Sequence, residues 1–376
     1  MKTKKDVRKV TCAEALLLDA VETASGTPRR VLTAGNRSGG VPVALMRRWP
    51  EAEVVAHAFD AHHARAIRKR LLDESLPPRQ ARCTAGVASE GTDALGPAEG
   101  VAPYDVAFFM TTPRSMPAEL VLDQLQDIHE NLAEGGAFYA AFEGDPDDAL
   151  NVMRLVWRTV NVVKRAKHAV LFRAVRRGEP VKQRVFAADW QASVPGGQPL
   201  TLTTYPGCFC HRRADTGGLA LAEVAAREVA SWGGGRILDM GCGCGLVGLL
   251  VADAARRLNP EAQWDLTLVD SHARAIAAAK VNAARAGIEA EFILSDDGLP
   301  RGRVGEFDLF VGNPPYYSDY RIADVFLETA YCALKPGGLC LSVVKTASGL
   351  VPVQEKYFSA VEVIKRRGYC ILKSIR

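Results

Sequence analysis

The stretch "GRILDMGCGCGL" at residues 235–246 joins an apolar run to a cluster of glycines, and the apolar segment "LVGLLVADAARRL" at residues 246–258 continues it. A strand, a glycine-rich turn and a helix in this order form a loop whose backbone can approach a ligand at a helix N-terminus. Strand-like and helix-like segments keep alternating along the second half, as in the alanine-rich stretch 271–287. This alternation predicts an α/β fold with a mainly parallel, doubly wound sheet.

The first half of the chain carries a second copy of this pattern. The stretch "RRVLTAGNRSGG" at residues 29–40 aligns with residues 235–246 without a gap. The remaining matches pair residues 59–67 with 269–276, 104–113 with 307–315, and 131–141 with 333–343. Four matches in the same order and at similar spacing predict two tandem domains that arose by duplication.

The two copies differ at the positions that would carry chemistry. Asp239 aligns with Thr33, Gly243 aligns with Arg37, and the "NPP" triplet at residues 313–315 aligns with threonines. We therefore expect the first domain to have kept its fold and to have lost cofactor binding and catalysis.

A segment rich in glycine, proline and charged residues, 176–202, separates the two copies. This composition is typical of a domain boundary. It predicts a degenerate domain at residues 1–180, a linker at 181–200 and a catalytic domain at 201–376.

The composition indicates a globular protein. Hydrophobic residues make up 48% of the 376 positions and charged residues 24%, which argues against an intrinsically disordered chain. No apolar run in the sequence approaches the roughly 18 residues that a membrane helix needs. The nine cysteines lack paired spacing, and the fragment "CFCH" at 208–211 has no CxxC partner. We expect a cytoplasmic protein that binds neither a membrane nor a metal ion.

A basic stretch ends the first copy. Between Arg154 and Arg184, ten lysines and arginines stand against one acid, Glu179. Such a stretch either follows the phosphates of a nucleic acid or forms a solvated face, and the charge run alone leaves both open. On the first interpretation, the residues that bind RNA are Arg154, Arg158, Lys164, Arg165 and Lys167.

The glycine-rich loop contains the dinucleotide pattern GxGxxG at Gly243, Gly245 and Gly248, and Asp270 follows 22 residues later. On this spacing a nicotinamide enzyme and a turn without a ligand both remain open. Asp239, two residues before the first glycine, favours a cationic amino acid over a pyrophosphate. Asp270, at the end of the next strand, suits two ribose hydroxyls. Both details favour S-adenosylmethionine.

The third strand of this copy ends in "SDD" at residues 295–297. An acid in this place, with Asp296 preferred, can accept a hydrogen bond from the amino group of adenine. Asp-Asp-Gly is also ordinary turn chemistry, so the pattern is compatible with a plain turn as well.

The fourth strand ends in "NPPY" at residues 313–316. The Asn313 side-chain oxygen and the Pro314 carbonyl could accept both hydrogens of an exocyclic amine and point its lone pair at a sulfonium methyl group. Tyr316 offers a ring on which a base turned out of its helix can stack. Alone, the motif would indicate a proline-rich strand end. Here it follows the cofactor loop, at the carboxyl edge where such sheets bind ligands.

Together these motifs resemble those of class I S-adenosylmethionine-dependent methyltransferases. More narrowly, almost the whole chain resembles the ribosomal RNA guanine-N2 methyltransferases of the small-subunit 16S type, which have a large-subunit sister group. The segment 209–225 resembles the region where that family enters its catalytic domain, and "LKPGG" at 334–338 matches as well. The resemblance implies two tandem Rossmann-like class I methyltransferase domains, of which the first is degenerate.

The resemblance also implies S-adenosyl-L-methionine as cofactor and a guanine of ribosomal RNA as target. It assigns cofactor binding to Asp215, Asp239, Gly241, Cys242, Gly243, Asp270, Ser271, Asp296 and Asn313, and catalysis to Asn313, Pro314 and Tyr316. The chain departs from the family pattern at Tyr317, where a histidine or similar residue is frequent, and at Lys345, where an asparagine is usual.

Three alternatives share some of these features. Adenine-N6 and protein glutamine-N5 methyltransferases also use "NPPY", because a side-chain amide resembles an exocyclic amine. A non-catalytic RNA-binding scaffold would keep both folds without either motif. The preferred hypothesis is a monomer that acts on ribosomal RNA or on a ribosomal subunit.

Overall fold

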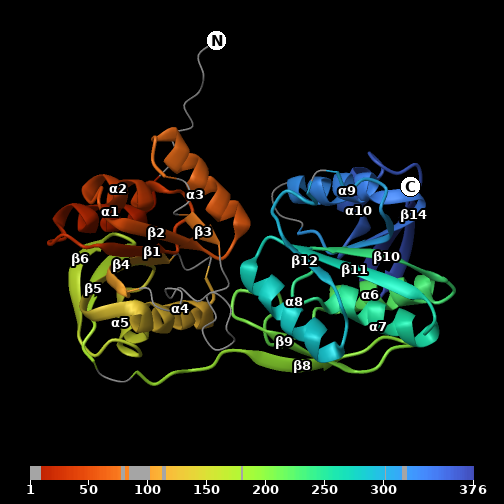
Figure 1. Ribbon diagram of the computed structural model, residues 1–376, viewed down its shortest axis with the longest axis horizontal. Helices are drawn as coiled ribbons and strands as arrows, with labels where there is room; N and C mark the ends of the chain where they lie inside the picture. The colour runs from red at the N-terminus through yellow and green to blue at the C-terminus, as the bar shows by residue number, and fades with distance from the viewer. Residues whose placement is uncertain are drawn as a thin grey trace, which may run out of the picture. The chain divides into compact units, whose positions relative to one another are not determined.

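The computed structural model describes residues 10–77, 81–83, 102–111, 116–178, 181–300, 302–315 and 320–376. The chain divides into two compact units, Met1–Phe186 and Ala187–Arg376 (Figure 1). Each unit has its own seven-stranded sheet.

The first unit is a doubly wound α/β domain. Its helices are α1 (Cys12–Thr23), α2 (Gly40–Arg48), α3 (Ala61–Asp73), α4 (Ala118–Asn131) and α5 (Pro146–Arg154). Its strands are β1 (Arg30–Ala34), β2 (Glu53–Ala58), β3 (Ala81–Cys83), β4 (Tyr104–Thr111), β5 (Leu132–Glu143), β6 (Val160–Ala166) and β7 (Ala169–Val175). The strand order is β3-β2-β1-β4-β5-β7-β6. The sheet is parallel except at β7, which runs antiparallel to both of its neighbours.

The second unit repeats this order as β12-β11-β10-β13-β14-β16-β15. Its strands are β10 (Gly234–Met240), β11 (Gln263–Asp270), β12 (Glu291–Leu294), β13 (Phe307–Gly312), β14 (Leu334–Val344), β15 (Glu362–Arg366) and β16 (Tyr369–Ile375). Its helices are α6 (Thr216–Val229), α7 (Leu246–Leu258), α8 (Ala273–Ala286), α9 (Arg321–Ala333) and α10 (Ala347–Gln354). Again only the penultimate strand in the order, β16, is antiparallel to its neighbours. The predicted tandem of mainly parallel, doubly wound domains is confirmed.

Helices cover both faces of each sheet because the strands are apolar on both faces. In β1, Val31 packs with the core cluster that includes α1, α2 and α3, whereas the next residue, Leu32, packs with the cluster that includes α4 and α5. Successive side chains of a strand point to opposite faces, so two adjacent apolar residues serve two cores. Figure 1 shows α1 to α3 on one face of the first sheet and α4 and α5 on the other.

The strand register brings four strand ends of the second unit to one edge. Met240, the last residue of β10, pairs with Val269 of β11 and with Gly312 of β13. Asp270, the last residue of β11, pairs with Leu294 of β12. The loops that follow these four strands therefore leave the sheet side by side, which is where the sequence placed the cofactor and target motifs.

The segment between the two sheets is tied to both units. Near its start, the main chain of Arg184 exchanges two 3.0 Å hydrogen bonds with the Gln126 side chain of α4. Further on, β8 (Ala188–Ala192) and β9 (Leu200–Thr204) form an antiparallel pair. Asn282 of α8 holds the N–H and the carbonyl of Thr203 through its side-chain amide. In the described part of the chain, no helix is long and apolar enough to cross a membrane.

Candidate active site

The loop between β10 and α7 turns through three left-handed glycines. Gly241, Gly243 and Gly245 have φ angles of +70°, +55° and +84°, a region that side chains other than glycine rarely adopt. The N–H groups of Gly241 and Cys242 donate to the Val269 carbonyl of β11, at 2.8 and 3.0 Å. The glycine-rich loop is therefore fixed against the neighbouring strand and is not free to collapse.

Gly243 leaves the outer side of this loop open. A Cβ added to Gly243 would meet no atom within 4 Å, whereas one at Gly241 would lie 2.8 Å from the Phe326 ring. A Cβ at Gly248, in the first turn of α7, would lie 2.7 Å from Leu268 and 3.0 Å from Asp239. Gly248 thus allows close packing of helix on strand, and Gly243 exposes backbone to a ligand.

Asp239 lies buried at the base of the loop, with 2% of its surface exposed. Its Oδ2 accepts a 2.8 Å hydrogen bond from the Gly248 N–H. Burial raises the pKa of this carboxyl to about 7, with a further increase from the Asp270 charge, although the Gly248 hydrogen bond opposes the shift. A carboxylate with so little solvation is stabilised by a cation, and this is the kind of ligand it favours.

Asp270 joins the end of β11 to the loop. Its Oδ2 accepts from the Gly243 N–H at 2.9 Å, and its Oδ1 accepts from the His272 N–H at 2.8 Å. Two carboxylates therefore flank the glycine-rich loop. A pyrophosphate would be repelled by them, whereas S-adenosylmethionine carries an ammonium and a sulfonium, so the residues present fit this cofactor.

Asn313 follows β13 and is held from α6. Its Nδ2 donates a 2.7 Å hydrogen bond to Oδ2 of Asp215. Asp215 is the N-cap of α6 and also accepts from the N–H groups of Gly217 and Gly218, at 3.0 and 2.9 Å. Because the amide nitrogen is engaged by Asp215, the Asn313 oxygen is left as an acceptor for a ligand.

The resemblance assigns Asp215 to the cofactor, and the structure adds a contact with Asn313 that the sequence does not indicate. It contacts a residue 98 positions away in the chain. The signal in the sequence is the N-cap pattern Asp-x-Gly before an apolar helix, which predicts the cap and says nothing of Asn313.

The other residues named from the sequence lie as follows. Cys242 is buried, and burial raises the pKa of its thiol well above the ordinary value, so it stays protonated and is no nucleophile. Pro314 is buried, while Ser271 and Asp296 are half-buried at the ends of β11 and β12, on the same edge. Tyr316 lies outside the described residues. Within the described ranges, no group of three or more His, Cys, Asp or Glu side chains could hold a metal ion.

The five basic residues are all exposed. Arg154 ends α5, Arg158 lies in the following turn, Lys164 and Arg165 lie on the edge strand β6, and Lys167 lies in the turn to β7. Lys164 is paired with Asp19 of α1, with both side chains about half exposed. A surface pair of this kind contributes little to stability and leaves the side chain available.

In the first unit, side chains of the unit itself fill the equivalent loop. Asn36 donates to the hydroxyl of the buried Thr33. Glu14 of α1 is buried, accepts a 2.6 Å hydrogen bond from Ser38, and lies where a Cβ at Gly40 would be. The carboxyl of Glu14 therefore occupies the loop that would receive a cofactor.

The second unit has the reverse arrangement at the equivalent positions. Glu14 is three residues after the N-cap Thr11, and Gly218 is three residues after the N-cap Asp215. A Cβ at Gly218 would lie 3.0 Å from Leu246, the residue aligned with Gly40. In the first unit the helix carries the large side chain and the loop carries glycine. In the second unit the helix carries glycine and the loop carries the large side chain.

Residues 199–373 match the family model described as the methyltransferase small domain. This match lies within the second unit. The matched range includes the loop after β10, the strand ends at one edge and Asn313, so the features described above lie inside the part of the chain that matches this model.

Two curated relatives illustrate the range of similarity. A ribosomal RNA small subunit methyltransferase C from Pseudomonas entomophila is 30% identical over 183 residues, which are 47% of this chain and 52% of that protein. The chain thus spans about half the length of the small-subunit relatives that it matches. A ribosomal RNA large subunit methyltransferase G from Pseudomonas paraeruginosa is 28% identical over 370 residues, 96% of this chain and 91% of that protein.

A solved structure shares the whole fold. The T. thermophilus 16S rRNA N2 methyltransferase RsmC, determined in complex with AdoMet and guanosine, superimposes with a TM-score of 0.74 at 21% identity. The match covers 96% of this chain and 92% of that one. The chain therefore has the same fold as that enzyme, two tandem Rossmann-like domains.

Proposed function

We propose that this chain transfers a methyl group from S-adenosylmethionine to the exocyclic N2 amine of a guanine in ribosomal RNA, of the 16S type. The observation that carries the proposal is the Asn313 side chain, held by Asp215 at the end of β13, beside a loop flanked by two carboxylates. The relatives named above, both ribosomal RNA methyltransferases, and the guanosine complex of the T. thermophilus enzyme support the choice of substrate.

The cofactor would be held by the glycine-rich loop and the three strand ends beside it. S-adenosylmethionine supplies a methyl group made electrophilic by the positive sulfur. Asp239 gives a buried negative charge near the loop, and Asp270 offers the remaining lone pairs of its carboxylate to ribose hydroxyls. Asp296 would accept from the adenine amine. Gly241, Cys242, Gly243 and Ser271 complete the proposed cofactor-binding set with their backbone and small side chains.

The target amine would be held by acceptors. The Asn313 oxygen and the Pro314 carbonyl accept the two N2 hydrogens, which turns the nitrogen lone pair toward the methyl carbon. As the new N–C bond forms, the methyl carbon–sulfur bond breaks and its electron pair stays on sulfur. The methylated amine then carries a positive charge that the same two acceptors stabilise, and its extra proton leaves to water. Tyr316 would stack on the base.

The RNA would be held outside the methyltransferase small domain as well. We assign RNA contact to the exposed basic residues of the first unit, Arg154, Arg158, Lys164, Arg165 and Lys167. The filled loop around Glu14 supports a first unit that serves RNA binding and has no cofactor of its own. We propose further that the protein acts as a monomer in the cytoplasm and uses no metal ion.

The experiment is methyl transfer from labelled S-adenosylmethionine to separated small-subunit and large-subunit ribosomal RNA, each offered naked and within its subunit. The methylated nucleoside is then identified by mass spectrometry. We expect N2-methylguanosine in the small-subunit RNA. Detection of N6-methyladenosine would mean that the target base is adenine and not guanine. Label found only on glutamine of a ribosomal protein would overturn the proposal.

A further inference from the structure

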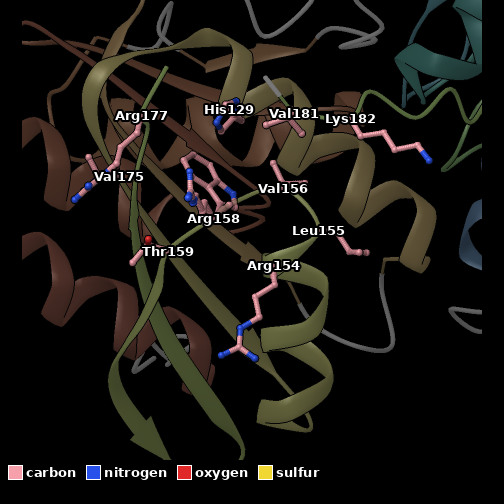
Figure 2. A pocket seen from close by; sticks show the side chains of 11 residues that line it. His129, Arg154, Leu155, Val156, Arg158, Thr159, Val175, Arg177, Val181 and Lys182 are labelled. Atoms are coloured by element: carbon pink, nitrogen blue, oxygen red, sulfur yellow. The ribbon is translucent and has the colours of Figure 1, made fainter. Parts of the chain in front are cut away.

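A cavity of about 180 Å³ lies in the first unit, at the sheet edge opposite the filled loop (Figure 2). Its walls come from the last turn of α4 at His129, the turn between α5 and β6, the end of β7 at Val175, and residues 181–182. Val175, the last residue of β7, pairs with Ala137 in the first half of β5, and α4 ends directly before β5, so both elements end at the edge where β5 begins. The cavity therefore lies away from the carboxyl edge where this fold binds its cofactor.

The rim of this cavity is cationic. Arg154, Arg158, Arg177 and Lys182 line it, and no lining residue that the structure describes is acidic. Figure 2 shows the charged ends of Arg154, Arg177 and Lys182 on different sides of the cavity, each pointing outward from its rim. Among the described residues, none of these three side chains has a carboxylate partner. Like charges gathered without an acid indicate a site for an anion.

Two acids near α4, Glu130 and Glu134, accept hydrogen bonds from residues outside the cavity lining. Glu134 accepts a 2.7 Å hydrogen bond from the Gly178 N–H, and Glu130 accepts from the side chain of Gln183. Glu179 lies outside the described residues. Neither Glu130 nor Glu134 lines the cavity, so no described carboxylate pairs with Arg154, Arg177 or Lys182.

The floor of the cavity is rigid. Trp157 is 2% exposed and stacks on Phe138, with ring centroids 4.7 Å apart and planes 16° apart. The ring of His129 meets Trp157 edge-on at 4.8 Å. Burial and the charge of Arg176 lower the pKa of His129, while the charge of Glu134 opposes them, so the net shift favours the neutral imidazole and the positive charge belongs to the rim. A fixed floor keeps the cavity open without a ligand.

The volume of the cavity limits the size of the ligand that it can hold. Pockets for drug-sized molecules and cofactors have volumes of about 300–1,000 Å³, well above that of this cavity. One phosphate group fits, and arginine is the side chain best suited to bind it with two hydrogen bonds. We propose that this pocket binds one backbone phosphate of the RNA that the second unit methylates, a proposal that rests on the proposed function.

The test compares two double variants of the full chain that lose the same charge. Arg154→Gln with Arg177→Gln removes two rim cations. Arg47→Gln with Lys69→Gln removes two cations of the same unit that are paired with acids on α3 and its C-cap, and it serves as the control. Binding of fluorescein-labelled small-subunit ribosomal RNA is measured by anisotropy over a range of salt concentrations. Affinity for S-adenosylmethionine and the urea midpoint verify that both variants are folded.

We expect the rim variant to bind RNA about ten-fold more weakly than the wild type near 0.15 M salt, since it loses charge-assisted hydrogen bonds to a phosphate. The slope of log affinity against log salt should fall by about 0.7–0.9, the value for one phosphate. The control variant should stay within about two-fold of the wild type because its cations already have partners.

The other outcomes each overturn the proposal in a different way. If the wild type methylates and binds the RNA, and both variants bind it equally well, the pocket proposal falls and the proposed function stands. If the wild type neither binds nor methylates ribosomal RNA, both fall together. In a final experiment, calorimetric titration measures the affinity of the wild type and the rim variant for inorganic phosphate. Phosphate binding that is lost in the rim variant while RNA affinity is unchanged would assign the pocket to a free phosphorylated compound.

Discussion

Replacing Asp239 by asparagine should separate folding from cofactor binding. In the folded chain the pKa of this carboxyl is about 7, and in an unfolded chain it is near 3.8. Between these values the folded chain holds a proton that the unfolded chain has released, so the group destabilises the fold increasingly as pH rises. The cost is absent below pH 3.8 and complete above pH 7.

The size of the effect follows from the shift. About three pKa units at 1.36 kcal/mol each give a cost of about 4 kcal/mol above pH 7, of which about 3 kcal/mol develops between pH 5 and pH 8. Asparagine has nearly the shape of the protonated acid, and its oxygen can accept from the Gly248 N–H. The stability of Asp239→Asn relative to the wild type should therefore rise by about 3 kcal/mol from pH 5 to pH 8.

Cofactor affinity should change in the opposite direction to stability. An asparagine offers no charge to a cationic cofactor, so Asp239→Asn should weaken S-adenosylmethionine binding at pH 8. In the wild type, affinity should fall as pH drops below 7, because binding then requires Asp239 to lose its proton, and the variant should lose this dependence. Urea unfolding at pH 5 and pH 8 and calorimetry with S-adenosylmethionine measure both. A variant equally destabilised at both pH values, with wild-type cofactor affinity, would refute the reasoning.

The remaining predictions concern three other residues of the site. Gly243→Ala should weaken S-adenosylmethionine binding at least ten-fold. The control Gly287→Ala has a similar φ of +64° and equally open space, so it should carry the same backbone strain of about 1 kcal/mol and leave binding unchanged. Equal losses of affinity in calorimetry would count against an open loop at Gly243. Asn313→Ala should reduce methyl transfer at least 100-fold with cofactor affinity kept, and parallel loss of both would remove the amine-holding role. Asp215→Asn keeps a good N-cap but loses the charge that holds Asn313, so kcat should fall about ten-fold with the urea midpoint unchanged; an unaltered kcat would reduce Asp215 to a cap.

The fold was predictable because its signal is repeated. The alignment of residues 29–40 with 235–246 predicts two domains of one kind, and both sheets have the same strand order. Apolar runs ending in glycine or Asn-Pro-Pro identified the carboxyl ends of β10 and β13, because a strand buried on both faces has to be apolar throughout.

The contacts within the site were less predictable than its location. The hydrogen bond from Asn313 to Asp215 joins two loops that no local pattern connects. Glu14 offered only a weak signal, an acid in the apolar helix segment "CAEALLLDAV", and its position against Ser38 depends on how α1 packs on the loop. Sequence periodicity identifies which face of an element is buried, and it does not identify the partner across a packed interface.

Glu14 and Gly40 of the first unit occupy the positions that Gly218 and Leu246 occupy in the second, and neither residue of a pair can change alone without a packing cost. If Glu14 alone reverted to glycine, Ser38 would lose its acceptor and an empty space would remain beside Gly40. If Gly40 alone became leucine, its Cβ would overlap the Glu14 carboxyl. Each single change therefore carries a packing cost, so we expect the two residues of either pair to be kept or replaced together.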